Sequence, residues 1–455
     1  MYHSNKTLQS IYSISPFWVQ NSFFTIHGMI KSVQSKKVNS LIRRMISNKV
    51  FITKTELQKE QFDKIKKILV HSYNNVPYFK RLFDNNNINL TTINSLKDFK
   101  RIPITLKNDI VSNQSKFLSR NSPKFNPIKG NTGGTTGSSL KYYLDSEYYN
   151  WLKEVQFHSF LKRHDFIVGR DRHIVLRGTV LSPDKLKIDK MWREDSFRKI
   201  LYFSSYHLTN EVMDLYYKKM VQWRPKFVRA YPSSIFFMAK YMIRKNLKYK
   251  LKGVFCSSES VLDSHRNAVE NAFDCKIFDH YGHGEPGCYA AGQCVYGNYH
   301  IPSDDVYMEL TDNGQIVETC LSNFSMPFIR YNIEDTADSI NYGCKCGLGS
   351  PFFSKIYGRD DEKIITPSGR NIGRLDQIVI GTNIRKAQIV QNDIFELIIK
   401  IVKGNNFSFK DEEKLMKNVL SRVGSSISIK LEYVKDIPLT KSGKFRFVVS
   451  NITKK

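Results

Sequence analysis

The sequence is organised around Gly130-Asn131-Thr132-Gly133-Gly134-Thr135-Thr136-Gly137-Ser138-Ser139-Leu140-Lys141. These twelve residues contain four glycines and five hydroxyl side chains, and the strand-like Tyr142-Tyr143-Leu144 follows them. Glycine lets successive backbone N–H groups turn toward an anion, and small hydroxyls add donors for phosphate oxygens. The spacing fits neither the Walker pattern nor the dinucleotide fingerprint. The stretch predicts a phosphate-binding loop, with a flexible Gly/Ser turn between strands as the alternative.

Length and composition indicate a soluble globular protein of several domains. A chain of 455 residues is too long for one core and predicts about two or three domains. Hydrophobic residues make up 41% of the chain, yet no apolar run reaches the roughly 18 to 20 residues of a spanning helix. The N-terminus lacks the pattern of a signal peptide. Seven cysteines without a regular framework fit a reducing compartment, so we expect a cytoplasmic protein.

The net charge of +28 comes from 70 basic and 42 acidic residues. Such a charge favours polyanionic partners, among them nucleotides, nucleic acid, acidic glycans and anionic membranes. The lysines are spread along the whole chain, and no single run resembles a nucleic-acid arm. We therefore do not expect nucleic acid as a partner. General solubility and coding bias account for the charge better than a specific polyanionic partner does.

The first half of the chain predicts an arm followed by helices. Residues 1–50 are basic and rich in Ser and Asn, and we expect them to form a loosely attached arm that contacts the body or a peripheral membrane surface. From Thr55 to Val76 apolar residues recur at three- and four-residue steps, which predicts an amphipathic helix capped by Thr55. A second short helix is expected from Tyr78 to Phe83.

Between residues 150 and 280 strand-like and helix-like segments alternate. Strands are predicted at 173–177, 226–230, 251–256 and 276–279, and helices at 211–223, 233–244 and 263–273. This alternation favours an α/β domain with largely parallel strands. Ligands bind at the carboxyl ends of such strands. Polar segments at 231–234, 256–259 and 280–285 follow three of them and therefore predict a binding site.

The remainder predicts a β-rich part and a small terminal domain. Residues 299–338 alternate as strands do, and residues 357–361 resemble a junction. The last hundred residues predict an α+β unit, with strands near Ile364 and Ile378 and at 394–402 and 428–434, and a helix at 410–423. We therefore predict three parts: an arm at 1–50, a large domain at 51–357 and a C-terminal domain at 358–455.

Four side chains are candidates for chemistry on a nucleotide. Glu285 is a hard oxygen ligand suited to Mg²⁺, or else an exposed loop carboxylate. Asp335 could accept hydrogen bonds from ribose hydroxyls, or it is a residue of a strand-end turn. Arg359 could reach the same ribose or a phosphate. Lys444 follows Ser-Gly and could stabilise negative charge at phosphorus, or it belongs to a solvated basic tail.

Cysteine and histidine form a separate constellation. Cys294, His300, Cys344 and Cys346 offer four ligands in two close pairs, which suits a closed tetrahedral Zn²⁺ site, with free thiols as the alternative. The other cysteines, Cys256, Cys275, Cys288 and Cys320, are expected to be buried core residues. A thiol acyl-transferase that pairs Cys288 or Cys256 with His283 or His280 is a further alternative without a recognised signature.

Taken in order, these motifs resemble the adenylate-forming superfamily, most closely its phenylacetate:CoA ligase-like branch with the capsule-biosynthesis and coenzyme F390 synthetase-like relatives. The resemblance covers about residues 55 to 455. The motifs that carry it are Gly133-Gly134-Thr135-Thr136-Gly137, Tyr281-Gly282-His283-Gly284-Glu285, Gly358-Arg359-Asp360-Asp361 and Ser442-Gly443-Lys444. The pattern departs from the family at Gly133, at Ser139-Leu140 and at Gly284, where a serine, Pro-Lys and a hydroxyl residue are usual.

The resemblance implies a large N-terminal α/β domain and a small C-terminal α+β lid, with the active site between them. It assigns the glycine loop to the ATP phosphates, Glu285 to Mg²⁺, Asp335 and Arg359 to the ribose, Asp361 to the hinge and Lys444 to the α-phosphate. The remaining residues expected at the nucleotide are Thr132, Ser258, Glu259, His280, Tyr281 and Gly282. The expected wall of the acid pocket is Tyr231, Ser233, Ser234 and Phe236, or these are core residues at the start of a helix.

The predicted function is ATP-dependent activation of a small carboxylic acid to an acyl-adenylate, followed by transfer to CoA or to an amine, in settings that include polysaccharide or capsule assembly. The alternative is a catalytically degenerate member that binds a nucleotide or another polyanion without turnover. Nothing in the sequence selects the acid, the acceptor or the oligomeric state, for which a homodimer is one option.

Overall fold

The computed structural model describes residues 12, 15–30, 52–132, 140–151, 155–178, 191–359, 364–367, 371–372, 375–379, 382–424, 426–440 and 445–452. The chain forms two compact units. Unit 1 comprises Met1–Met29, Val168–Ile277 and Gly358–Lys455, and unit 2 comprises Ile30–Ile167 and Phe278–Tyr357. One boundary falls where we expected the C-terminal domain to begin, but the functional division into arm, large domain and lid stays a prediction.

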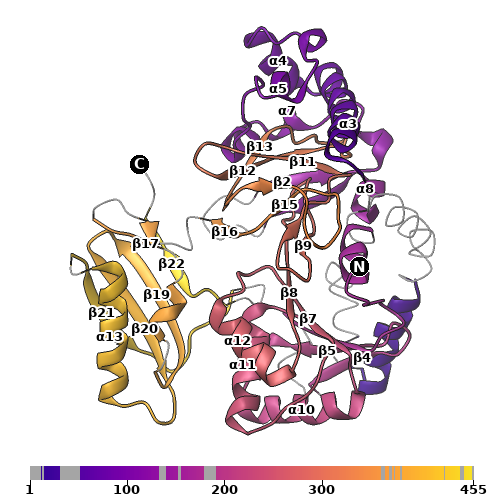
Figure 1. Ribbon diagram of the computed structural model, residues 1–455. Coiled ribbons are helices and arrows are strands. Elements are labelled where there is room, and N and C mark those ends of the chain that lie inside the picture. The colour runs from indigo at the N-terminus through magenta and orange to yellow at the C-terminus, as the bar shows by residue number, and fades with distance from the viewer. Residues whose placement is uncertain are drawn as a thin grey trace. The chain divides into compact units, whose positions relative to one another are not determined.

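Unit 1 contains a twisted sheet with strand order β7-β6-β3-β5-β4. Its strands are β3 (His173–Arg177), β4 (Trp192–Asp195), β5 (Ile200–Ser204), β6 (Phe227–Ala230) and β7 (Gly253–Ser257). All pairs are parallel except β4 with β5. Helices α10 (Asn210–Trp223), α11 (Pro232–Arg244) and α12 (Asp263–Phe273) bury their apolar sides against these strands (Figure 1). The predicted α/β alternation is confirmed, because strands buried on both faces read as continuous apolar runs.

The described part of the predicted arm is helical over residues 17–30. It contacts the edge strand β4 through Arg193, which is fully buried. The Arg193 guanidinium donates from Nε to the Tyr12 hydroxyl at 3.0 Å and also donates to the Gln20 side-chain oxygen. A buried guanidinium needs such partners because its desolvation is costly.

The C-terminal part of unit 1 is a four-stranded sheet of order β21-β20-β19-β22 with one helix. Its elements are β19 (Ile384–Asp393), β20 (Glu396–Lys403), α13 (Phe409–Val423), β21 (Ser428–Tyr433) and β22 (Val448–Ser450). Leu415, Val419 and Val423 of α13 pack on Ile389, Ile399 and their neighbours (Figure 1). The short strands β17 (Ile364–Ile365) and β18 (Asn371–Ile372) precede this sheet. The strand predicted near Ile378 is wrong, because this residue lies in the 3-10 helix η8 (Leu375–Val379) and is buried there by α13.

Unit 2 begins with a layer of helices. They are α3 (Lys54–Asn75), α4 (Pro77–Asn85), η2 (Leu90–Thr92), α5 (Leu96–Phe99), α6 (Lys107–Ser112), α7 (Gln114–Phe117) and η3 (Ser122–Phe125). The cap predicted at Thr55 is wrong. Thr53 caps α3 by accepting from the Glu56 N–H, and the Glu56 carboxylate accepts in return from the Thr53 N–H, so a capping box sets the start of the helix.

Beneath these helices lie the β-rich elements of unit 2 (Figure 1). The antiparallel strands β11 (Val306–Leu310), β12 (Gln315–Cys320) and β13 (Tyr331–Ala337) pack against the helices in one core. Smaller strands are β1 (Ile128–Asn131), β2 (Lys141–Leu144), β8 (Ile277–Tyr281), β9 (Ala291–Gln293), β10 (Tyr299–His300), β14 (Ile340–Asn341), β15 (Phe352–Phe353) and β16 (Ile356–Arg359), and short helices are α8 (Ser146–Trp151) and α9 (Phe157–Lys162).

The segment before α6 is tied to β13. The Thr105 N–H donates to the Arg330 carbonyl at 2.9 Å, and the Asn332 N–H donates to the Thr105 carbonyl at 3.0 Å. The Arg330 side chain is buried against Glu309, with Nε 3.0 Å from Oε2. Within the described residues, no helix combines the length and the apolar character that crossing a membrane requires.

Candidate active site

A tight turn follows β8 and holds the predicted magnesium ligand. It closes where the His283 N–H donates to the Cys288 carbonyl at 3.1 Å. A Cβ atom at Gly282 would lie 2.1 Å from the Tyr289 carbonyl oxygen, and one at Gly287 would lie 2.2 Å from Oε1 of Glu318. Only glycine fits these two positions, because any side chain would displace the neighbouring backbone or a buried carboxylate.

Glu285 lies on this turn in a buried cluster of three charged groups. His283 places Nε2 3.0 Å from Oε2 of Glu318 and Nδ1 3.5 Å from Oε2 of Glu285. Burial lowers the pKa of His283, but the two carboxylates outweigh it and raise this pKa to about 10. Burial raises the pKa of Glu318 although His283 opposes the effect. The raised pKa of His283 favours an imidazolium between the carboxyl groups of Glu285 and Glu318.

Glu285 is only 4% exposed, which contradicts the alternative that it is an exposed loop carboxylate. A buried carboxylate beside a second acid is a suitable ligand for a hard divalent cation, because the cation neutralises charge that water does not reach. The geometry thus agrees with the chemistry expected of Glu285.

The base of the glycine stretch lies beside this turn. Strands β1 and β2 form a hairpin, which Thr132 and Leu140 extend: the Thr132 N–H donates to the Leu140 carbonyl at 2.9 Å, and the Leu140 N–H donates to the Thr132 hydroxyl at 3.0 Å. The ring of Tyr142 covers Gly130, and its hydroxyl lies 2.9 Å from the position of a Cβ atom at Gly284. Residues 133–139, and with them Gly133, Gly134, Thr135, Thr136 and Gly137, lie outside the described part of the chain.

Asp335 is joined to the same turn by Tyr281. The Tyr281 hydroxyl donates to Oδ2 of Asp335 at 2.6 Å, and Asp335 is largely buried within β13 rather than in a turn at its end. The other predicted residue of β8, His280, is buried against the rings of Phe157 and Phe160. Thr132, Tyr281, Glu285 and Asp335 thus gather in one part of unit 2.

The remaining described candidates belong to unit 1. Glu259 accepts hydrogen bonds from the Ser233 N–H at 3.0 Å and from the Phe445 N–H at 3.2 Å. It therefore satisfies an N–H at the start of α11 and one in the residue that follows Lys444. Ser258 has a left-handed backbone with φ of 71° directly after β7.

The residues predicted to wall the acid pocket lie at the start of α11. Ser233 and Ser234 are buried there. Tyr231 precedes the helix, with the Arg177 guanidinium 5.6 Å from its ring centroid. Phe236 contacts the His265 ring at a centroid distance of 4.5 Å.

Three further predictions concern residues whose side chains are not described. Asp361 and Lys444 lie outside the described residues. Arg359 is the last residue of β16, and its side chain is likewise not described. Their roles at the ribose, the hinge and the α-phosphate stay predictions.

The alternative of a nucleophilic cysteine finds no support in the geometry. Cys288 is fully buried, burial raises the pKa of its thiol well above the usual range, and Cys256 is equally buried in the core. Both ring nitrogens of His283 face carboxylates, so this histidine is not placed to act as the base for Cys288.

The predicted zinc ligands Cys294, His300, Cys344 and Cys346 come together, with ligand atoms all within 4.8 Å of one another.

Sequence reasoning missed Glu318 and Tyr142 as partners of the turn. Glu318 stands in an alternating strand pattern, where a glutamate normally faces solvent, yet it is fully buried. The sequence does contain one signal of this burial: Glu318 is a charged residue at an inward position of β12, between Val317 and Thr319.

Comparison with known proteins agrees with this fold. Residues 364–451 match the family model described as the CapK C-terminal domain. The chain is 26% identical over 467 residues to Protein CapK of Staphylococcus aureus, covering 98% of this chain and 100% of that protein. A 2-hydroxyisobutyryl-CoA ligase crystallised in the postadenylation state with R3-HIB-AMP superposes with a TM-score of 0.69 at 16% identity, covering 88% of this chain and 90% of the ligase.

The same ligase in the thioesterification state, with 2-HIB-AMP and CoA, superposes with a TM-score of 0.55 at 16% identity over 88% of this chain and 91% of the ligase. The predicted resemblance is thereby confirmed. The chain has the fold of this CoA ligase, and its residues 364–451 are similar to the CapK C-terminal domain.

Proposed function

We propose that this protein activates a carboxylic acid with ATP. The product would be an acyl-adenylate, formed with release of pyrophosphate, and the acyl group would then pass to CoA or to an amine. The similarity to Protein CapK supports a role in polysaccharide or capsule assembly. The observation that carries the proposal is that the β1–β2 hairpin, the turn that holds Glu285, and Asp335 come together in unit 2.

Each group has a role in this proposal. The backbone of the glycine stretch would hold the β- and γ-phosphates of ATP above the hairpin base formed by Thr132 and Leu140. Glu285 would hold Mg²⁺, which supplies charge neutralisation at the phosphate oxygens when bound. Asp335, which accepts from Tyr281, would also accept from a ribose hydroxyl.

The reaction would be an in-line displacement at the α-phosphorus. A carboxylate oxygen of the acid forms the new bond to phosphorus, the bond to the bridging oxygen breaks, and pyrophosphate leaves. Lys444 would stabilise the charge that develops on the equatorial oxygens. Movement about Asp361 would then remove this ammonium group and admit the acceptor. Phe445, the residue after Lys444, donates its N–H to the Glu259 carboxylate. This hydrogen bond holds the chain next to Lys444 against another part of unit 1.

The test is acid-dependent exchange of labelled pyrophosphate into ATP, which requires no knowledge of the acceptor. The panel of acids includes short hydroxy acids such as 2-hydroxyisobutyrate, because the superposed ligase was also crystallised with 2-HIB-AMP. We expect exchange with at least one acid, and we expect Lys444→Ala to reduce it by about a hundredfold to a thousandfold, as removal of a charge-stabilising group does.

Lys414→Ala is the matched control, because Lys414 is exposed on α13 and its loss should leave exchange unchanged. No exchange with any acid, together with retained nucleotide binding, would favour the non-catalytic alternative. Exchange that survives Lys444→Ala would contradict the role given to this lysine.

A further inference from the structure

Four potential metal ligands meet in unit 2, and none of them has a role in the proposed reaction. Cys294 follows β9, His300 ends β10, and Cys344 and Cys346 lie between β14 and β15. The sulfur atoms of Cys294 and Cys344 are 3.8 Å apart, and Nε2 of His300 is 3.1 Å from the sulfur of Cys346. Two thiolates on a tetrahedral zinc, each about 2.3 Å from the metal, are about 3.8 Å apart.

Two tight turns aim the cysteines at this point. The Gly297 N–H donates to the Cys294 carbonyl at 2.9 Å, and the Gly347 N–H donates to the Cys344 carbonyl at 3.0 Å. Gly297 and Gly347 have φ values of 82° and 83°, in the left-handed region that favours glycine. The two turns therefore have the same construction, with a cysteine at the start and a glycine three residues later.

His300 is oriented from its other side. Its Nδ1 is hydrogen-bonded to the Ser350 hydroxyl at 3.0 Å, which leaves Nε2 directed at the sulfur of Cys346. A ligand histidine is usually fixed in this way through the ring nitrogen that does not bind the metal. The Asn298 side-chain amide also donates to the sulfur of Cys344 at 3.2 Å.

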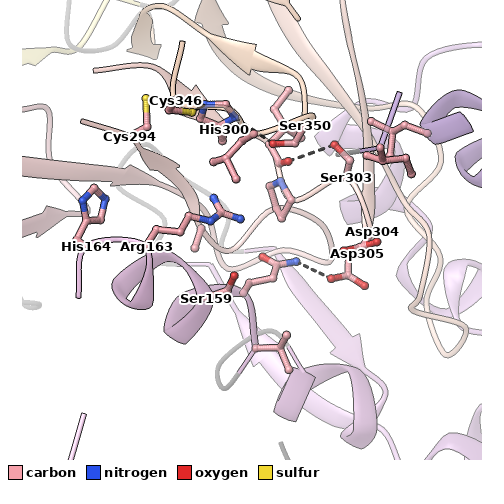
Figure 2. A pocket seen from close by; sticks show the side chains of 18 of the residues that line it. Ser159, Arg163, His164, Cys294, His300, Ser303, Asp304, Asp305, Cys346 and Ser350 are labelled. Carbon is pink, nitrogen blue, oxygen red and sulfur yellow. Dashed lines mark hydrogen bonds between the residues drawn. The ribbon is translucent and has the colours of Figure 1, made fainter. Parts of the chain in front are cut away.

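A cationic side chain lies beside the cluster. Arg163 extends from the end of α9 into a cavity of about 480 Å³ that Cys294, His300 and Cys346 also line (Figure 2). The guanidinium and these three side chains line the same cavity. Three thiolates and one imidazole around a divalent cation carry a net charge of minus one, and the guanidinium supplies the opposite charge.

We propose that Cys294, His300, Cys344 and Cys346 bind one structural Zn²⁺. Binding would displace the protons of the three thiols, leave no open coordination position, and join the β9–β10 connection to the β14–β15 connection. Since β10 pairs with both β9 and β15 in strands of two or three residues, hydrogen bonds alone hold this region weakly, and a metal would fix it. The inference does not depend on the proposed reaction.

The test begins with the full-length chain, purified under reducing conditions from cells supplied with zinc. Native mass spectrometry and elemental analysis should find about one Zn²⁺ per chain. A strong chelator should lower the melting temperature, and Zn²⁺ but not Mg²⁺ should restore it. Replacement by Co²⁺ should give the visible absorption of a tetrahedral cobalt thiolate, a readout that needs no variant and no activity.

Variants then locate the site. Cys344→Ser should reduce bound zinc to background, whereas Cys275→Ser, which changes a cysteine outside the cluster, should keep one equivalent. Ser350→Ala should weaken zinc affinity about tenfold, and the control Ser354→Ala should not. Wild-type protein that neither contains zinc nor takes it up would overturn the proposal. A Cys294–Cys344 disulfide in the native protein, or full zinc in Cys344→Ser, would also overturn it.

Discussion

Replacing His283 with glutamine is the most informative perturbation of the active-site turn. The wild-type imidazolium separates the buried carboxylates of Glu285 and Glu318, at 3.5 and 3.0 Å. Glutamine keeps the size and some hydrogen bonding but removes the charge. Breaking a buried ion pair by removing one partner costs about 3 to 5 kcal/mol, because the remaining charge is left uncompensated.

The raised pKa of His283 corresponds to a stabilisation of similar size. At about 1.4 kcal/mol per pKa unit, the rise from 6.5 to about 10 corresponds to about 5 kcal/mol. Since the pKa is higher in the folded protein, this stabilisation is complete below about pH 6.5 and is lost as the pH rises toward 10. The advantage of the wild type over His283→Gln should therefore shrink by about 2 to 3 kcal/mol between pH 7 and pH 9.

Hydrogen exchange measures this locally. At pH 7, peptides containing residues 281–289 and 315–320 should exchange about a hundredfold faster or more in His283→Gln than in the wild type, which corresponds to about 3 kcal/mol. Peptides from α13 serve as the internal reference. Comparison at equal pH removes the intrinsic pH dependence of exchange.

His164→Gln is the matched control. Burial lowers the pKa of His164 to about 4, so its ring is neutral throughout this pH range and any effect of the change should not vary between pH 7 and pH 9. An effect of His283→Gln below about 1 kcal/mol at pH 7, or one that stays constant up to pH 9, would refute the charged triad.

Three further changes test the fold around the site by chemical denaturation. Gly282→Ala should destabilise the protein by about 1 to 3 kcal/mol and impair pyrophosphate exchange, because the new methyl group meets the Tyr289 carbonyl; wild-type stability would contradict this. Arg330→Met should lower the free energy of unfolding by about 3 to 5 kcal/mol, because it leaves Glu309 buried and unpaired. Adding Glu309→Leu should recover most of that stability, and no recovery would argue against the ion pair as the cause. Glu259→Ala should cost about 1 to 3 kcal/mol by removing the acceptor of two backbone N–H groups, whereas Glu259→Gln should cost less; equal losses would contradict that account.

Much of the architecture could be predicted from local patterns. The helices at 211–223, 233–244 and 263–273 and the strand at 173–177 were expected almost to the residue, because apolar periodicity and flanking turn residues mark both ends. The errors had local causes. Thr55 resembles a cap as well as Thr53 does, and only the Glu56 side chain decides between them. Ile378 is an apolar residue buried under α13, and an apolar buried residue occurs equally in a strand and in a 3-10 turn.

The candidate site was predictable only where a motif is contiguous. Glycines and a carboxylate within 281–285 identify the turn, and paired cysteines identify the second cluster. The partners of these motifs lie far away in sequence, as Glu318 does from His283, and only the folded chain brings them together. A single sequence gives no signal for such a pairing beyond an unexpected charge in an apolar strand.

The contact between Tyr142 and Gly284 makes two distant positions depend on each other. A hydroxyl-bearing side chain at 284, usual in the family that the motifs resemble, would begin at a point 2.9 Å from the Tyr142 oxygen, so the phenol would have to move. The tyrosine thus brings its own hydroxyl to the space that such a residue would fill. A threonine at 284 should therefore be tolerated only together with a smaller residue at 142. The two positions can then change together but not independently.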